Sequence, residues 1–250
     1  MTLTEDGIAV IDGDAWLSQQ IRNEHRLDVH HARVIVDMMQ RFIPRGGTVC
    51  DVGACLGDHT IGYADIVGPT GTVHAFEPNP AAYECLRYNV QYRPWVSCYP
   101  YALADHISRC EMGPEPNNLD NVGMVTIHRE RPDGPVVMTT LDDVAKDWDR
   151  LDFVKIDVEG VEHALLAGAV QTLSMWKPVV LIEVNRGALQ NHGATPNDVF
   201  KRLERLGYVF SPICIQGISM DPFVRIQEDE VDVVCVPREH EMADGFLSLA

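Results

Sequence analysis

The sequence has few basic residues, and this shortage excludes several classes of partner. Its 20 Lys and Arg face 37 Asp and Glu, which gives a net charge of −17 over 250 residues. A surface of that sign repels nucleic acid and anionic membranes, so we expect neither as a partner. The chain also lacks a run of the ~20 apolar residues that a membrane span needs. Residues 1–6 are acidic and polar and lack the apolar segment of a secretory signal.

Paired cysteines are missing as well. The seven cysteines are scattered, and no two of them stand in a Cys-x-x-Cys pair. This spacing argues against a disulfide framework and a zinc site, and it favours a reducing compartment, so we expect a cytoplasmic protein. The remaining composition is ordinary, with 46% hydrophobic and 23% charged residues. It predicts a globular chain with a sizeable core, built as one large domain or one domain with additions.

Apolar runs and helical patterns alternate along most of the chain. This order predicts an α/β fold with a mostly parallel sheet. The expected strands are 48–51, 72–76, 96–102, 151–156 and 178–182, with closing strands at 208–210 and 231–236. The expected helices are 27–42, 61–66, 80–92, 160–173 and 196–206. Residues 1–24 predict a small hairpin or arm, and 103–139 an insertion whose hairpin pairs 124–128 with 135–139.

The stretch 48–60 joins a strand to a helix through two glycines, Gly53 and Gly57. Glycine lets the backbone approach a ligand closely, because it has no Cβ. The spacing Gly-x-x-x-Gly differs from the Gly-x-Gly-x-x-Gly that cradles a pyrophosphate. The turn therefore favours a ligand with a nucleoside but without the need for a diphosphate. Asp58, just after the turn, is expected to cap the helix.

Four of the five core strands end in an acid, at Asp51, Glu77, Asp157 and Glu183, and the fifth ends at Ala102. Unpaired carboxylates are costly at the end of a buried strand. The carboxyl ends of the strands line the ligand crevice of open α/β sheets, so these acids predict one binding cleft. Glu77 suits the two hydroxyls of a ribose. The excess negative charge also fits S-adenosylmethionine, which carries a ribose, an ammonium and a sulfonium.

Three segments of the sequence resemble the FkbM-type methyltransferases. They are Asp51-Val52-Gly53-Ala54, Gly71-Thr72-Val73-His74-Ala75-Phe76-Glu77-Pro78-Asn79-Pro80 and Lys155-Ile156-Asp157-Val158-Glu159-Gly160-Val161-Glu162. The resemblance covers roughly residues 45–240 by motif order. It implies a class I, Rossmann-like methyltransferase fold with a seven-stranded, mostly parallel sheet flanked by helices and a hairpin insertion before the fourth strand. The domain then spans 45–250, and residues 1–44 form an arm and a helix that cover the cleft.

The resemblance also implies S-adenosylmethionine as the donor, and O-methylation of a hydroxyl on a sugar or small natural product. Cofactor contacts are carried over position by position. The methionine and ribose end of the donor would contact Asp51, Gly53, Ala54 and Gly57, and its ribose hydroxyls would bind Glu77. Its adenine would contact Pro78, Asn79, Ala102 and Leu103. Asp157 would lie beside the methyl group that is transferred.

An alcohol must lose a proton before it attacks the methyl group, which calls for a base or a metal. Asp157, Glu159 and His163 are the candidate bases. Glu159 and His163 are four residues apart at an expected helix start, so they can contact each other; the alternative is a surface ion pair. Asp157, Glu183 and Asn185 resemble the magnesium ligands of catechol-type O-methyltransferases, and oxygen ligands suit Mg²⁺.

Two other classes of protein stay open at this point. One is a nucleotide-dependent oxidoreductase or epimerase on a related sheet, against which the missing third glycine and the missing Tyr-x-x-x-Lys pair weigh. The other is a non-catalytic cofactor-binding module. The sequence identifies neither the acceptor, beyond a small hydroxylated molecule, nor the oligomeric state, so a homodimer stays open.

Overall fold

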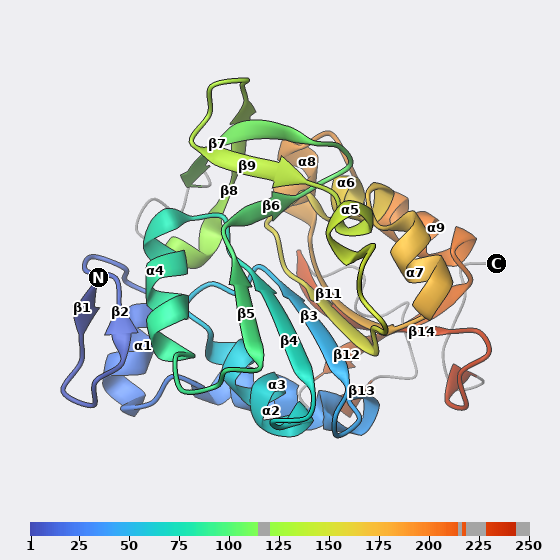
Figure 1. Cartoon of the computed structure of the whole chain (residues 1–250). Coiled ribbons are helices and arrows are strands. Elements are labelled where there is room, and N and C mark those ends of the chain that lie inside the picture. The colour runs from blue at the N-terminus through green and yellow to red at the C-terminus, as the bar shows by residue number, and fades with distance from the viewer. Residues whose placement is uncertain (115–120, 215–216, 219–228, 244–250) are drawn as a thin grey trace. The chain divides into compact units, whose positions relative to one another are not determined.

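The computed structural model describes residues 1–114, 121–214, 217–218 and 229–243 (Figure 1). The chain forms two compact units. The first comprises Met1–Ala102 with Ser108–Met138, and the second Leu103–Ile107 with Thr139–Ala250. The boundary falls inside the predicted insertion, at residues 103–107 and 138–139. Each unit is described by itself.

The first unit contains three parallel strands, β3 (Thr48–Val52), β4 (Thr72–Phe76) and β5 (Val96–Tyr99). Asp51 is in register with Ala75, and Ala75 with Cys98. Helix α3 (Asp58–Val67) connects β3 to β4, and α4 (Pro80–Asn89) connects β4 to β5 (Figure 1). All five residues of β3 are buried, as expected for a strand that is covered on both faces.

The amino-terminal arm of this unit forms a two-stranded hairpin followed by helices. Strand β1 (Thr2–Leu3) pairs antiparallel with β2 (Ala9–Val10), which confirms the predicted hairpin. Helix α1 (Leu17–Glu24) was not expected from the sequence, and the helix predicted at 27–42 is α2 (His30–Met39) with a 3-10 turn, η1 (Gln40–Phe42). The arm is part of the core, because Ala9 and Val10 are fully buried.

The predicted insertion is present, but its strands pair differently from the prediction. It contains β6 (Tyr101–Leu103), β7 (Ser108–Pro114), the 3-10 turn η2 (Val122–Met124), β8 (Val125–Glu130) and β9 (Val136–Thr139). Strands β8 and β9, expected to form a hairpin with each other, both pair antiparallel with β7 instead. Residues 115–120 of the insertion lie outside the described residues.

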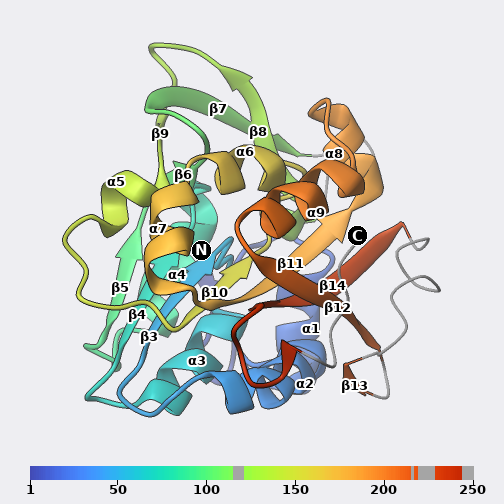
Figure 2. The same cartoon turned by 90° about the vertical axis from the view of Figure 1, so that its right-hand side faces the viewer.

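The second unit contains the parallel strands β10 (Phe153–Ile156) and β11 (Val179–Asn185). Strand β14 (Glu230–Pro237) runs antiparallel to β11, and β12 (Tyr208–Cys214) antiparallel to β14 (Figure 2). The short β13 (Gly217–Ile218) pairs with β12. The helices of this unit are α5 (Leu141–Ala145), α6 (Glu162–Ala167), α7 (Val170–Trp176), α8 (Arg186–Asn191) and α9 (Pro196–Arg205).

One predicted helix of the second unit is broken. The apolar spacing of 160–173 predicts a single helix, but α6 ends at Ala167 and α7 begins at Val170. Between them, a Cβ on Gly168 would lie 2.0 Å from the carbonyl oxygen of Ala104. The backbones therefore meet at Gly168, where only glycine fits.

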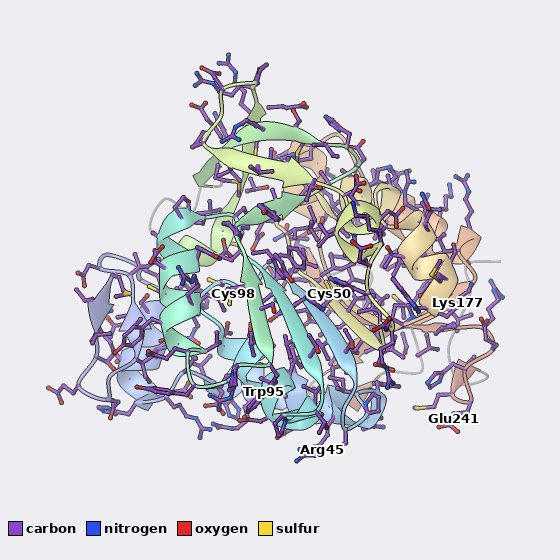
Figure 3. All side chains as sticks on the ribbon, in the orientation of Figure 1. Arg45, Cys50, Trp95, Cys98, Lys177 and Glu241 are labelled. Atoms are coloured by element: carbon purple, nitrogen blue, oxygen red, sulfur yellow. The ribbon has the colours of Figure 1, made fainter. Side chains whose placement is uncertain are left out.

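Two further findings concern absences in the described part of the chain. None of its helices is long and apolar enough to cross a membrane. Six cysteines in it are free thiols, among them Cys50 and Cys98, which are labelled at the strands in Figure 3.

Candidate functional site

The turn between β3 and α3 folds tightly against the end of β4. The backbone N–H groups of Gly53 and Ala54 both donate to the carbonyl oxygen of Phe76 at 3.0 Å. Gly53, Cys55 and Gly57 have positive φ angles of 81°, 47° and 96°. The positive φ of Gly57 favours glycine, and an added Cβ would also lie 3.0 Å from the end of the Leu86 side chain, which would have to move. We call residues 53–57 the glycine loop.

Glu77 holds the glycine loop and the start of α4 together. This carboxylate, 7% exposed, directly follows β4. One of its oxygens accepts from the N–H of Cys55 at 2.8 Å, and the other accepts from the N–H of Asn79 at 2.7 Å. Hydrogen bonds from the backbone fix the carboxylate before any ligand arrives, and a carboxylate can accept about four hydrogen bonds in all. Asn79 is the N-cap of α4 and accepts from the N–H of Ala81.

Asp51 and Asp58 lie differently from the sequence expectation. Asp51 is fully buried inside β3, and its carboxylate accepts from the Thr60 hydroxyl at 2.6 Å, which ties the strand to the first turn of α3. Gly57, in a left-handed conformation, is the N-cap of α3, so the prediction that Asp58 caps the helix is wrong. Asp58 is the first helical residue and contacts the His59 ring at 3.3 Å.

An aromatic cluster lies on β4 and β5 beside the strand ends. The rings of Phe76 and Tyr99 stack with centroids 4.7 Å apart, and Nδ1 of His74 lies 3.1 Å from the Tyr99 hydroxyl. Burial lowers the pKa of His74 to about 4, since the charged imidazolium is poorly solvated there. Ala102 and Leu103, expected to contact the adenine, are both buried.

In the second unit, Asp157 follows β10 directly and is paired with a lysine. Lys155 Nζ donates to Asp157 Oδ2 at 3.0 Å, and the Lys155 side chain is 7% exposed. The two residues are two apart, so they project from the same face of the chain at the end of the strand. Sequence reasoning quoted Lys155 in a motif but gave it no role. The two-residue spacing of a lysine and an acid was the available signal.

Three carboxylates gather at the ends of β10 and β11. One oxygen each of Asp157, Glu159 and Glu183 lies within 4.8 Å of the other two. Burial, then the charge of Asp157 and that of Asp232 across the β11–β14 pair, raises the pKa of Glu183 well above its usual range. Grouped carboxylate oxygens suit a proton or a hard cation, so this acid cluster (Asp157, Glu159 and Glu183) could hold either one.

The turn that carries Glu159 is shaped by unusual backbone angles. Glu159 and Gly160 have φ angles of 51° and 97°, and a Cβ on Gly160 would lie 2.4 Å from the Ala188 carbonyl oxygen. Glu162, 1% exposed, accepts from the Gly160 N–H at 3.0 Å. Burial raises the pKa of Glu162 to about 7. Sequence reasoning assigned Glu162 no role, because nothing in a sequence reveals this burial.

His163 and Asn185 have partners away from the acid cluster. Arg202 of α9 donates to Nε2 of His163 at 3.0 Å. Glu159 lies before α6, which begins at Glu162, so the two residues do not share the helical turn on which their expected contact rested. Asn185 is the N-cap of α8, where its Oδ1 accepts from the Ala188 N–H, and its Nδ2 donates to Glu230. The catalytic role of His163 and the metal-binding role of Asn185 stay predictions.

A comparison with known protein families bears on both groups of residues, those around the glycine loop and those of the acid cluster. The family described as "Methyltransferase FkbM domain" matches residues 51–210, which is more than half of the chain. The chain belongs to this family. The match begins at Asp51 of β3 and includes the glycine loop, Glu77 and the acid cluster. The FkbM-type resemblance predicted from the motifs is therefore confirmed.

One solved structure supports the fold of this FkbM family member. A precorrin-6y C5,15-methyltransferase from Geobacter metallireducens GS-15 is 13% identical with a TM-score of 0.51, over 94% of this chain and 98% of that one. This likeness confirms the class I methyltransferase fold. Two others score lower. The Aeropyrum pernix fibrillarin bound to S-adenosyl-L-methionine is 13% identical (TM-score 0.49; 82% of this chain, 73% of that chain). The O-methyltransferase TomG from Streptomyces achromogenes, in complex with SAM, is 11% identical (0.47; 92% and 92%). No curated protein matches the sequence.

A cavity of about 510 Å³ in the first unit of the FkbM chain lies apart from the site residues. It is lined by α2 and α3, with Arg33, Asp37, Arg45 and Asp65 among its residues. Arg45 donates to the carbonyl oxygens of Asp65 and Ile66, the last turn of α3, and so caps that helix. None of the residues predicted for the site lines this cavity. Its charged residues come from α2, from α3 and from Arg45 before β3, and we assign the cavity no ligand.

Proposed function

We propose that this FkbM family member transfers a methyl group from S-adenosylmethionine to a hydroxyl oxygen of a small acceptor, a sugar or natural product. The observation that carries the proposal is Glu77, whose carboxylate is fixed by the Cys55 and Asn79 N–H groups beside a glycine loop. A carboxylate held in place beside a glycine loop, whose backbone can approach a ligand closely, suits a ribose with two hydroxyl donors.

The remaining donor contacts follow from the position of the loop. The backbone of Gly53, Ala54 and Gly57 contacts the ribose and the methionine part of the donor. Asp51 supports the loop by accepting the hydrogen bond from Thr60, which ties β3 to α3. Pro78 and Asn79 flank the adenine. Ala102 and Leu103 offer it buried apolar surface.

The acid cluster removes the proton from the acceptor hydroxyl. Methyl transfer breaks the bond between carbon and the sulfonium sulfur, forms a bond between carbon and oxygen, and releases the hydroxyl proton. A carboxylate of the cluster takes that proton, with Asp157 beside the methyl group. Of the candidate bases, we favour Glu159, because it is buried, held at a positive φ and grouped with Asp157. His163, which faces Arg202, is the less suited candidate.

A second candidate role for the cluster is to hold Mg²⁺. Its three grouped oxygens fit a hard cation, and Asp157, Glu159 and Glu183 would be the ligands. Asn185, the last residue of β11, stays a predicted further ligand. A bound Mg²⁺ would lower the pKa of the acceptor hydroxyl. We expect exhaustive EDTA treatment to lower the transfer rate and added Mg²⁺ to restore it. A rate that EDTA leaves unchanged would assign the cluster to proton transfer alone.

Isothermal titration with S-adenosylmethionine and with S-adenosylhomocysteine tests the proposal. We expect heat of binding from both, and mass spectrometry of a panel of hydroxylated acceptors should then detect a methylated product. Absence of heat at high protein concentration would overturn the proposed donor. Binding of NADH instead would favour an oxidoreductase, and donor binding without turnover of any acceptor would favour a non-catalytic module.

A further inference from the structure

We infer that Asn89, the last residue of α4, is a positioning residue that fastens the amino-terminal arm to the glycine loop, so that the arm supports the donor site. This inference rests on the proposed function. Sequence reasoning assigned the arm only to covering the cleft, and it gave Asn89 no role.

The Asn89 side chain makes three hydrogen bonds with two segments far apart in the sequence. Its Oδ1 accepts from the Ala9 N–H at 2.8 Å, and its Nδ2 donates to the Ala9 carbonyl at 3.0 Å. The same Nδ2 donates to the carbonyl of Leu56 in the glycine loop at 2.9 Å. An amide nitrogen has two hydrogens, and these bonds use both. Asn89 therefore has no donor left for a ligand and acts through the segments that it joins.

Apolar packing joins the same segments. Leu56, fully buried, lies in one cluster with Ala9 and Val10 of the arm, Ile21 of α1, and Ala82 and Cys85 of α4. An added Cβ on Gly57 would approach Leu86, Val90 and Leu27. The glycine loop thus packs against the arm and α4. The three hydrogen bonds of Asn89 fix the position of the loop on that surface.

Two side chains hold consecutive residues of the loop. Glu77 accepts from the N–H of Cys55, and Asn89 donates to the carbonyl of Leu56. The loop also carries positive φ angles at Gly53, Cys55 and Gly57, which persist only where the surroundings enforce them. Release of the Leu56 carbonyl would therefore let the loop move relative to Glu77, its proposed partner at the ribose.

Two substitutions at Asn89 separate loop positioning from general stability. Asn89→Asp keeps the acceptor for the Ala9 N–H but places an acceptor against the Leu56 carbonyl, whereas Asn89→Ala removes all three bonds. Trp95→Phe is the matched control. Its indole Nε1 donates to the Ala64 carbonyl at 2.9 Å near α3, so it also loses a bond from a side chain to backbone, but one outside the glycine loop (Figure 3).

Two measurements on the full chain follow, both at temperatures where each variant is fully folded. In hydrogen–deuterium exchange without ligand, we expect faster exchange at residues 53–57 in both Asn89 variants and unchanged exchange there in the control. In isothermal titration with S-adenosylhomocysteine, we expect affinity about tenfold weaker in both Asn89 variants, since each releases the Leu56 carbonyl and lets the loop move, and unchanged in the control.

The outcomes distinguish the inference from the proposed function. Exchange at 53–57 that matches the wild type, or an unchanged affinity in both Asn89 variants, overturns the inference even if their thermal unfolding temperature falls. A wild-type chain that does not bind S-adenosylhomocysteine overturns the proposed function and, with it, the donor-site role of Asn89. The exchange data then still decide whether Asn89 fastens the loop.

Discussion

In the proposed complex, Glu77 holds the ribose of the donor. Its carboxylate accepts from two backbone N–H groups and, in the proposed complex, from the ribose hydroxyls. We expect Glu77→Ala to weaken S-adenosylhomocysteine binding by about a hundredfold, because hydrogen bonds to a charged group contribute about 1.5–3 kcal/mol each. Titration calorimetry measures this loss. Glu77→Gln, which keeps one acceptor oxygen, should lose less, and equal affinity in all three proteins would limit Glu77 to shaping the loop.

His74 makes stability depend on pH. Its pKa is lowered to about 4 in the folded chain from 6.5, so the unfolded chain takes up the proton first as pH falls. As pH falls from about 6.5 to about 4, proton uptake by His74 in the unfolded chain therefore lowers the free energy of unfolding by up to about 3 kcal/mol. Urea unfolding of the wild type and of His74→Gln should show their difference shrinking over that window. A difference independent of pH would contradict the assignment.

At the residue scale, the sequence predicted that Asp157 and Glu183 lie together but not what each acid contacts. Asp157 and Glu183 follow from strand order, because the carboxyl ends of neighbouring parallel strands share one edge. Glu159 was placed on a helix with His163, whereas its positive φ keeps it outside α6. The partner of Asp157, Lys155, and the three bonds of Asn89 depend on side-chain directions that spacing alone does not give.

At the scale of elements, the break between α6 and α7 can be tested at Gly168. A methyl group there would meet the Ala104 carbonyl oxygen at 2.0 Å, so either backbone must shift. We expect Gly168→Ala to lower the free energy of unfolding by about 3 kcal/mol, as overpacking does. Chemical denaturation provides the measurement, with Gly187→Ala in α8 as the control. At Gly187 the nearest atom is 3.5 Å away, and the added methyl should be neutral or slightly stabilising.

The central strands and helices were predictable because their apolar period is strong. Strand β4 matches the expected bounds, β3 extends one residue past the expected end at Asp51, and α9 differs by one residue. The expected strand 96–102 is divided into β5 and β6 around Pro100, which has no N–H for a ladder. The pairing of β8 and β9 with β7 could not be predicted, because short strands with polar faces specify their register weakly.

At the scale of the whole molecule, the net charge of −17 sets which partners can approach. Binding to nucleic acid relies on cationic side chains that displace counterions from phosphates. We expect no retardation of a labelled RNA oligonucleotide in a gel at physiological salt, even at micromolar protein. Retardation that weakens as salt rises would reveal a local basic surface and would redirect the search for the acceptor to RNA.

Helix α4 has its length fixed at both ends. Its N-cap, Asn79, donates its N–H to Glu77, and its last residue, Asn89, donates to the carbonyl of Leu56. A single inserted residue would turn Asn89 by about 100° and carry it ~1.5 Å along the axis. The amide would then miss both Ala9 and Leu56. Relatives that bind the arm in this way should therefore vary freely in the residues exposed on α4 while tolerating no insertion or deletion between the positions of Asn79 and Asn89.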